Sequence, residues 1–236
     1  MHRLRLQPLL GRRSEVRILR ESEVSIVDAG PPDVETAKCV TGARLCYKSE
    51  GGNREKDDEL IVSLIRKGHD AMLEHGGFSA IVTTDRGVTH ELVRHRLFSF
   101  AQESTRYCNY SKDKFGGEIA VMCPKEIWDV PSPEGNATWL SWEAAVQTAE
   151  RSYLQLIDDG LPSQIARAVL PTCLVSTIMI TGNFRQWRHF FKIRALGRAG
   201  KPHSGMKDVA TKLLALAVER YPIMFTDLKE ELDAQG

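Results

Sequence analysis

The sequence predicts a single α+β domain, and three observations lead to this fold class. Segments with apolar residues at helical spacing and short runs rich in β-branched residues are both present. They are interspersed irregularly, without the regular strand–helix alternation of a doubly wound sheet. The chain has 236 residues, of which 42% are hydrophobic and 27% charged, so it is long enough and apolar enough for a sizeable core.

The N-terminal half begins with a basic, irregular stretch, residues 1–22, which we interpret as an extension before a domain at 23–236. Residues 24–27 alternate enough for a short strand, which a Gly-Pro-Pro sequence ends. Asp33 is suited to cap the helix that follows, because its side chain can accept from a free backbone N–H. The spacing of apolar residues then predicts a helix over 57–67, a strand over 78–84, a turn at Arg86-Gly87 and a helix over 88–96.

The C-terminal half contains the longest predicted helix, residues 138–158, whose apolar side chains form one stripe. Gly160 ends that helix, and Pro162 and Pro171 bound a shorter one. Residues 174–181 are rich in β-branched side chains and predict a core strand. The other predicted elements are a short strand over 118–123, a loop with Pro131 and Pro133, a helix that Asn183 caps and that ends near residue 196, and a last helix from Asp208 through Tyr221 and beyond.

Charge and cysteine usage exclude several classes of protein. Lys and Arg total 32 against 31 Asp and Glu, so the chain lacks the large basic excess of a non-specific nucleic-acid binder. Its apolar runs are far shorter than a bilayer span, and its N-terminus does not resemble a signal peptide. The 5 cysteines are odd in number and include no C-x-x-C pair, which indicates free thiols in a reducing cytosol. We therefore expect a cytoplasmic protein with no zinc site and no nucleic-acid or membrane partner.

The densest polar segment is residues 94–107, where three arginines and a histidine accompany serine and threonine hydroxyls. Arginine grips phosphate with a planar fork of donors and stays charged at any relevant pH. The segment leaves a predicted helix and enters a loop, where backbone N–H groups are also free to donate. The alternative is a solvated basic turn, which the added Ser99, Ser104 and Arg106 make the weaker interpretation. We expect an anion site here.

A second basic segment covers residues 183–194. On a helix, Arg185, His189 and Lys192 share one face. From Asn183 to Lys207 inclusive there is no acid, while seven Lys or Arg residues occur, and such a field attracts anions. A basic surface helix whose aromatic residues simply pack into the core is the alternative interpretation.

Residues 68–75 contain two histidines and two acids, a composition that invites a metal site. His69-Asp70 resembles the pair of HD-type metal phosphohydrolases, but that chemistry needs a further histidine upstream, and His2 is the only one. Ser104 as an acyl-transfer nucleophile lacks a G-x-S-x-G elbow. The sequence contains neither a P-loop nor a convincing dinucleotide fingerprint. Helix capping and hydrogen bonding are the simpler roles for the acids and histidines of 68–75, and we assign no metal ligands.

Three blocks of the sequence together resemble the flavin-dependent thymidylate synthase family. The first is the pattern R-H-R-x2-S-x4-S-x-R, which is highly specific and is occupied by Arg94, His95, Arg96, Ser99, Ser104 and Arg106. Gly68-His69 with Glu74-His75 resembles the upstream G-H-x4-E-H segment of the family. The downstream half is represented by Arg167 before 169–171, then by Asn183-x-Arg185-x3-His189 and Arg194. The resemblance covers about residues 24–196.

The resemblance implies a fold with a mainly antiparallel sheet flanked by helices, and an enzyme that methylates dUMP at C5 to give dTMP. In the family, methylenetetrahydrofolate supplies the one-carbon unit, reduced FAD the hydride, and NADPH reduces the flavin. The resemblance also implies a homotetramer with its sites at subunit interfaces. The alternatives from other classes are a flavin- or nucleotide-binding protein without methyl transfer and an HD-type phosphohydrolase.

By resemblance, residue roles divide into three sets. Arg194 corresponds to the arginine that polarises the uracil ring and is the implied catalytic residue. The implied cofactor-binding residues are His69, Arg94, His95, Arg96, Gln102, Asn183, Arg185 and His189. The implied substrate-binding residues are Glu91, Arg94, Gln102, Glu103, Ser104, Thr105, Arg106, Arg167 and Arg194. Gln102 stands where glutamate is frequent, Ala71 where a hydroxyl residue is frequent, and 195–207 is longer than its usual counterpart.

Overall fold

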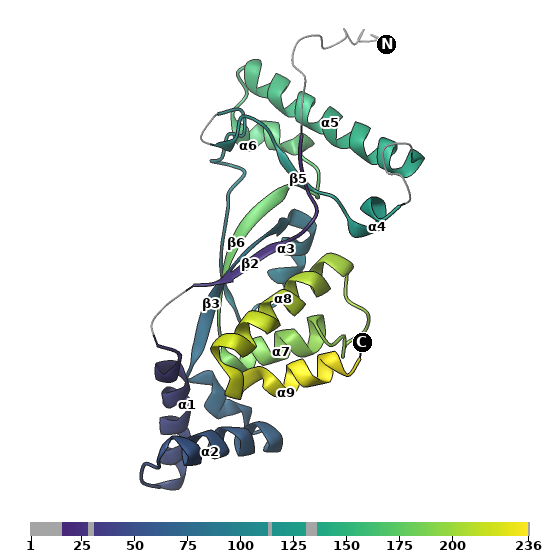
Figure 1. The fold of residues 1–236 in the computed structure, drawn as a ribbon. Helices are drawn as coiled ribbons and strands as arrows, with labels where there is room; N and C mark the ends of the chain where they lie inside the picture. Colours follow the sequence, from purple (N-terminus) through teal and green to yellow (C-terminus); the bar gives the residue numbers. More distant parts are fainter. Residues whose placement is uncertain (1–15, 28–30, 113–114, 131–135, 236) are drawn as a thin grey trace. The chain divides into compact units, whose positions relative to one another are not determined.

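A computed structural model describes residues 16–27, 31–112, 115–130 and 136–235 (Figure 1). The chain forms two compact units, each discontinuous in sequence. The larger unit comprises Ser22–Gln102 and Ser176–Gly236, and the smaller one comprises Met1–Glu21 and Glu103–Val175. Helices and strands are mixed without regular alternation, which confirms the predicted α+β class.

The larger unit is built on a four-stranded sheet in the order β2-β3-β6-β4. The strands are β2 (Glu23–Ile26), β3 (Gly77–Asp85), β4 (Ser99–Gln102) and β6 (Val175–Asn183). Both outer pairs are antiparallel, with Val24 opposite Val82 and Phe100 opposite Ile180. The predicted strands over 24–27, 78–84 and 174–181 are confirmed. β4 lies in a segment that was predicted to be a loop, and its pairing with β6 supplies the backbone partners that a loop would lack.

Alternating burial along β3 and β6 puts one face of this sheet into the core. Figure 1 shows α7 (Phe184–Arg194), α8 (Ser204–Arg220) and α9 (Pro222–Asp233) packed side by side against it. At the centre, the ring of Phe78 stacks on Trp187 with centroids 4.5 Å apart. The indole N–H of Trp187 donates to the Phe78 carbonyl at 3.1 Å, so its one polar group is satisfied inside the core.

Helix starts in this unit follow the capping chemistry of the sequence, with one difference at α1. α2 (Arg54–Lys67) begins where the Asn53 side chain accepts from the Lys56 N–H at 3.1 Å. α1 (Pro32–Tyr47) begins one residue before Asp33, so Asp33 lies in its first turn instead of capping it. Between α2 and β3 lies η1 (Asp70–Glu74), a short 3-10 helix.

The prediction of a turn at Arg86-Gly87 is wrong, because these residues begin α3 (Arg86–Leu92). The Asp85 carboxylate accepts from the Val88 N–H at 2.8 Å and caps this helix. The helix also ends at Leu92, four residues earlier than predicted. The single last helix is likewise wrong, since α8 and α9 are separated at Tyr221-Pro222, where proline cannot donate to the preceding turn.

The smaller unit pairs β1 (Arg17–Leu19) in parallel with β5 (Ala120–Met122). Residues 17–19 of the predicted irregular extension are thus a strand, while residues 1–15 lie outside the described part. The long predicted helix is confirmed as α5 (Ala137–Asp158), and it packs Val146 and Tyr153 into the core of this unit. The remaining elements are α4 (Lys125–Trp128), α6 (Ser163–Ala166) and η4 (Arg167–Val169). Pro131 and Pro133 of the predicted loop lie outside the described residues.

Candidate functional site

A cavity of about 950 Å³ lies in the larger unit, between α7, η1 and the segment 94–98. Six of the residues implied to bind the cofactor line it together, namely Arg94, His95, Arg96, Asn183, Arg185 and His189. Arg194 lines it as well. Residues separated by about ninety positions in the sequence therefore meet at one place.

The cap of α7 fixes the helix that forms one wall of this cavity. Asn183 Oδ1 accepts from the Gln186 N–H, and Gln186 Oε1 accepts from the Asn183 N–H, both at 2.9 Å. This reciprocal capping box satisfies two backbone donors at the start of the helix. Gln186 also donates to the Leu97 carbonyl at 2.8 Å, which links α7 to the segment on the other side of the cavity.

The two interpretations of residues 183–194 apply to opposite faces of α7. Phe184, Trp187 and Phe191 are fully buried and form part of the core. Arg185 and His189 are exposed and line the cavity. The helix is amphipathic, so the core-packing interpretation describes its aromatic face, while the cavity face carries the cations on which the anion-site interpretation rests.

Two arginines on α7 each pair with a carboxylate, but one pair includes a buried arginine and the other lies at the surface. Arg188 is 3% exposed and pairs bidentately with Asp227, its two N–H groups donating at 2.8 and 2.6 Å. It also donates to the Met224 carbonyl. Arg188 therefore ties α7 to α9 and is a structural residue. Arg185, by contrast, forms an ion pair with Glu74 at the surface, where such pairs contribute little to stability.

Arg194 is held between an acid and a histidine. One terminal N–H group donates to Glu91 Oε2 at 2.8 Å, and Nε donates to His95 Nε2 at 3.1 Å. Since Nε2 accepts here, His95 is neutral and carries its proton on Nδ1. Burial, followed by the charges of Arg194 and His189, lowers the pKa of His95 to about 4. The guanidinium of Arg194 thus lies beside a neutral ring.

Arg94 and Arg96 are exposed at the cavity, and neither guanidinium forms an ion pair or hydrogen bond with any described residue. Two guanidinium groups without a partner among the described residues suit a ligand phosphate.

Two residues of the implied cofactor set lie elsewhere. His69 is exposed and does not line the cavity, whereas Asp70 and Glu74 of the same motif do. Gln102 turns into the sheet, where its amide N–H₂ donates to Thr89 Oγ1 at 2.9 Å and Ser176 Oγ at 3.0 Å. A carboxylate cannot donate, so the glutamine at this position is explained by two buried hydroxyls that accept from it.

The remaining assigned residues gather in the smaller unit. Arg167 donates to Thr105 Oγ1 at 3.3 Å, and the Arg106 backbone N–H donates to Ser104 Oγ at 3.3 Å. The Arg106 side chain donates to Gln164 Oε1 at 3.2 Å. Glu103 accepts from the Tyr110 hydroxyl at 2.7 Å. Two arginines and two hydroxyls thus form a local cluster with the composition of a phosphate site.

Asp70, Gln164 and Lys192 are not among the site residues that the resemblance implies. Asp70 belongs to the motif at 68–75 and Lys192 to the cationic face of α7, so both carried a signal, whereas nothing in the sequence distinguishes Gln164. Among the described residues, no group of three His, Cys, Asp or Glu side chains is placed to hold a metal ion. In the same part of the chain, no helix is long and apolar enough to cross a bilayer.

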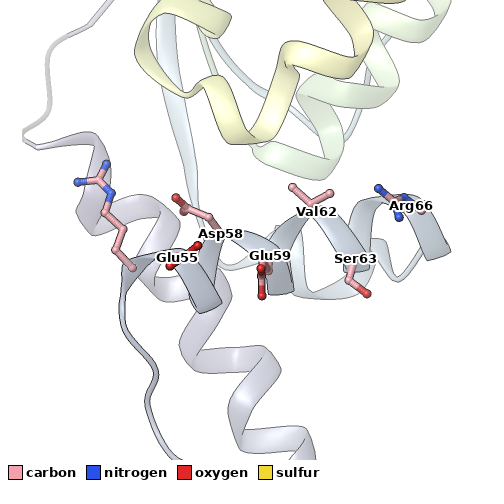
Figure 2. Close-up of a pocket in the computed structure, with 7 residues that line it drawn as sticks. Glu55, Asp58, Glu59, Val62, Ser63 and Arg66 are labelled. Carbon is pink, nitrogen blue, oxygen red and sulfur yellow. The ribbon is translucent and has the colours of Figure 1, made fainter.

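A second hollow lies along the outer face of α2, and Figure 2 shows that its side chains all come from this one helix. It mixes the acids Glu55, Asp58 and Glu59 with Arg66 and contains no residue assigned from the sequence. Charges of both signs on one solvated helix face do not define a ligand, so the cavity beside α7 is the candidate site.

Comparison with known proteins identifies the family of this chain. The sequence model of the family described as thymidylate synthase complementing protein matches residues 32–223. The flavin-dependent thymidylate synthase of Geobacter sulfurreducens is 33% identical over 209 residues, covering 83% of this chain and 82% of that protein. That of Corynebacterium aurimucosum is 33% identical over 229 residues, covering 89% and 86%.

Among solved structures, a UMP/dUMP methylase from Streptomyces cacaoi bound with 5-Br dUMP is similar, with a TM-score of 0.75. The alignment covers 91% of this chain and 97% of that one at 22% identity, so it shows a common fold.

Proposed function

The chain belongs to the flavin-dependent thymidylate synthase family, and on this premise we propose that it catalyses the reductive methylation of dUMP to dTMP. The observation that carries the proposal is the convergence of Arg94, His95 and Arg96 with Arg185, His189 and Arg194 on one cavity. These residues come from the motifs that identify the family, and the cavity has the cationic character that phosphorylated ligands require.

The residues of this cavity fit FAD. Its volume of about 950 Å³ is at the upper end of the range of roughly 300–1,000 Å³ typical of ligand sites. Arg94 and Arg96 offer guanidinium groups that no described residue occupies, and Arg185 and His189 add donors from α7. We assign these four residues to holding the cofactor, which when bound supplies the hydride of the reaction.

Arg194 is the residue to which we assign the activation of dUMP. C5 of uracil is a poor nucleophile, so negative charge must be stabilised on the pyrimidine as the reaction proceeds. A guanidinium that is already fixed does this without reorganisation. Glu91 and neutral His95 fix it here, and a neutral His95 does not compete with Arg194 for that negative charge.

We assign the dUMP phosphate to the cluster of Ser104, Thr105, Arg106 and Arg167. Arg106 and Arg167 carry the charge, and the two hydroxyls complete the donor set. Gln102 and Glu103 make internal hydrogen bonds, so we propose that they act as positioning residues for their neighbours. Methylenetetrahydrofolate as one-carbon donor, NADPH as reductant, a homotetramer with sites at subunit interfaces and a cytoplasmic location complete the proposal.

The test is a dTMP assay on the purified protein with dUMP, methylenetetrahydrofolate, NADPH and FAD. We expect dTMP to form only when all four are present. Flavin absorption without dTMP formation would instead favour a flavin-binding protein that lacks methyl transfer. Chelator-sensitive release of phosphate from dUMP, without bound flavin, would favour the phosphohydrolase alternative.

A further inference from the structure

Lys192 is a cation of the candidate site that the family motifs do not include. It lies on α7, three residues after His189, and its side chain lines the same cavity. It is half-buried. Within the described parts of the chain, no carboxylate lies within ion-pair distance of its Nζ and no hydrogen bond holds it.

The neighbouring cations, unlike Lys192, each form an ion pair. Arg185 pairs with Glu74, Arg188 with Asp227, and Arg194 with Glu91. Arg198, shortly after α7 ends, pairs with Glu231. Each arginine from 185 to 198 therefore has its own carboxylate, whereas Lys192 has none among the residues that the structure describes.

An ammonium group that is half-buried and unpaired is unfavourable in the ligand-free protein. Burial and the nearby charges of Arg188 and Arg198 lower the pKa of Lys192, while Asp70 of η1 and Asp227 of α9 oppose that shift from a distance. Such an ammonium group inside a cavity is a candidate for ligand binding, because an anion from solution would supply the counter-charge that it lacks.

We propose that Lys192 binds a phosphate group of a dinucleotide in this cavity and helps to determine which dinucleotide is accepted. The inference rests on the proposed function, which requires dinucleotides. Arg185 and Lys192 are seven residues apart on one face of α7, and a rise of 1.5 Å per residue separates them by about 10 Å. A cationic row of that length suits an extended ligand with more than one anionic group.

Two sources of this phosphate are chemically equivalent at the site. One is the diphosphate bridge of FAD, and the other is a phosphate of the nicotinamide reductant. In either case Lys192 acts as a point charge on a flexible stem. It takes no part in the transfer of the one-carbon unit or hydride.

The test compares Lys192→Gln with Lys192→Arg in the full-length protein. Lys67→Gln on α2 is the matched control, because it removes the same charge from an exposed position outside the cavity. The affinity of the apoprotein for FAD is measured by quenching of flavin fluorescence. Reduction of the bound flavin is then followed at increasing NADPH and, separately, NADH concentration.

We expect Lys192→Gln to weaken one of these affinities by about tenfold or more, as for the loss of one charge-assisted hydrogen bond. Lys192→Arg should restore most of the loss, and Lys67→Gln should match the wild type. A weaker affinity for FAD assigns the phosphate to the flavin cofactor. A weaker affinity for NADPH but not for NADH assigns it to the phosphate by which these two differ.

Binding of inorganic pyrophosphate to the apoprotein, measured by calorimetry, separates this inference from the proposed function. If the wild type binds no FAD but binds pyrophosphate in a Lys192-dependent way, the phosphate site stands and the proposed function fails. If the wild type binds FAD and makes dTMP, but Lys192→Gln leaves FAD, NADPH and pyrophosphate affinity unchanged, the Lys192 inference is wrong. Unchanged circular dichroism of the folded variants excludes misfolding as the cause of any loss.

Discussion

At the scale of single residues, Arg194 has the most closely defined surroundings of the site. Glu91 and His95 hold two different nitrogens of its guanidinium, so its orientation is set before any ligand arrives. We expect Arg194→Ala to lower the rate of dTMP formation by at least about 100-fold, the size of losing one preorganised charge in a transition state. FAD should remain bound, because Arg94, Arg96 and Arg185 are untouched.

The measurement is single-turnover dTMP formation together with the visible spectrum of the bound flavin. Arg151→Ala on α5 is a suitable control, since this exposed arginine lies in the other unit and outside every assigned site. Near-normal turnover of Arg194→Ala would show that another residue activates the uracil.

His95 leads to a prediction about pH. Its pKa is lowered to about 4 in the folded protein from a usual value of 6.5, so the unfolded state binds the proton more readily. Its contribution to stability is therefore complete above pH 6.5 and is lost as the pH falls from 6.5 towards 4. We expect the free energy of unfolding of His95→Gln to depend less steeply on pH in this window than that of the wild type.

Urea denaturation at a series of pH values measures this difference. The imidazole signal of His95 in an NMR titration gives the pKa directly. A midpoint near 6.5 would mean that the imidazole is neither desolvated nor held by Arg194.

The clustering of residues around the cavity was predictable from sequence where a motif specified it. Arg94, His95, Arg96, Arg185 and His189 all line one cavity, although nothing in the local sequence shows that the two motifs meet. Gln102 and His69 do not line it. The direction of the Gln102 side chain depends on Thr89 and Ser176, which are distant in sequence and carry no motif.

At the scale of elements, the cap of α7 connects stability to ligand binding. Asn183→Ala removes one half of the capping box, which we expect to lower the free energy of unfolding by about 1 kcal/mol. Because the same turn orients Arg185 and Gln186 at the cavity, we also expect weaker FAD binding.

Asn53→Ala is the matched control, since Asn53 caps α2 through the same kind of bond but does not line the cavity. Denaturant unfolding gives the stabilities and flavin fluorescence the affinities. Equal loss of FAD affinity in both variants would mean that the effect is one of general stability.

Helices and strands were predicted correctly where the apolar periodicity was strong. They were predicted incorrectly where one specific contact, such as a strand pairing or a helix cap, determined the local structure. Residues 138–158 have a continuous apolar stripe, and α5 agrees with the prediction to within one residue. β4 is a strand because β6 lies beside it, and this pairing partner is about eighty residues away. Arg86-Gly87 has the composition of a turn, but Asp85 caps a helix there and overrides the local preference of glycine.

At the scale of the whole molecule, the chain passes between its two units at residues 21–22, 102–103 and 175–176. Each unit therefore consists of segments that are not consecutive in sequence. The basic stretch 1–22 ends near the first of these points, but composition changes little at the other two, so the sequence alone indicated one domain over 23–236. Only the pairing of β1 with β5, and of β4 with β6, reveals which segments belong together.

The assembly is predicted from the family alone. We expect light scattering after size-exclusion chromatography to give a particle four times the mass of the chain. Reversible dilution should lower activity in parallel with any loss of the tetramer, because the sites are expected at subunit interfaces. A fully active monomer would contradict that arrangement.

The ion pair between Arg185 and Glu74 affects how ionic strength acts on this protein. In the ligand-free state the carboxylate already neutralises one cation of the cavity, so an incoming phosphate exchanges with an internal anion as well as with dissolved counterions. Ligand binding then releases fewer dissolved counterions than there are cationic side chains around the cavity. The affinity for a phosphorylated ligand should therefore fall less steeply with salt than the number of arginines and lysines around the cavity suggests.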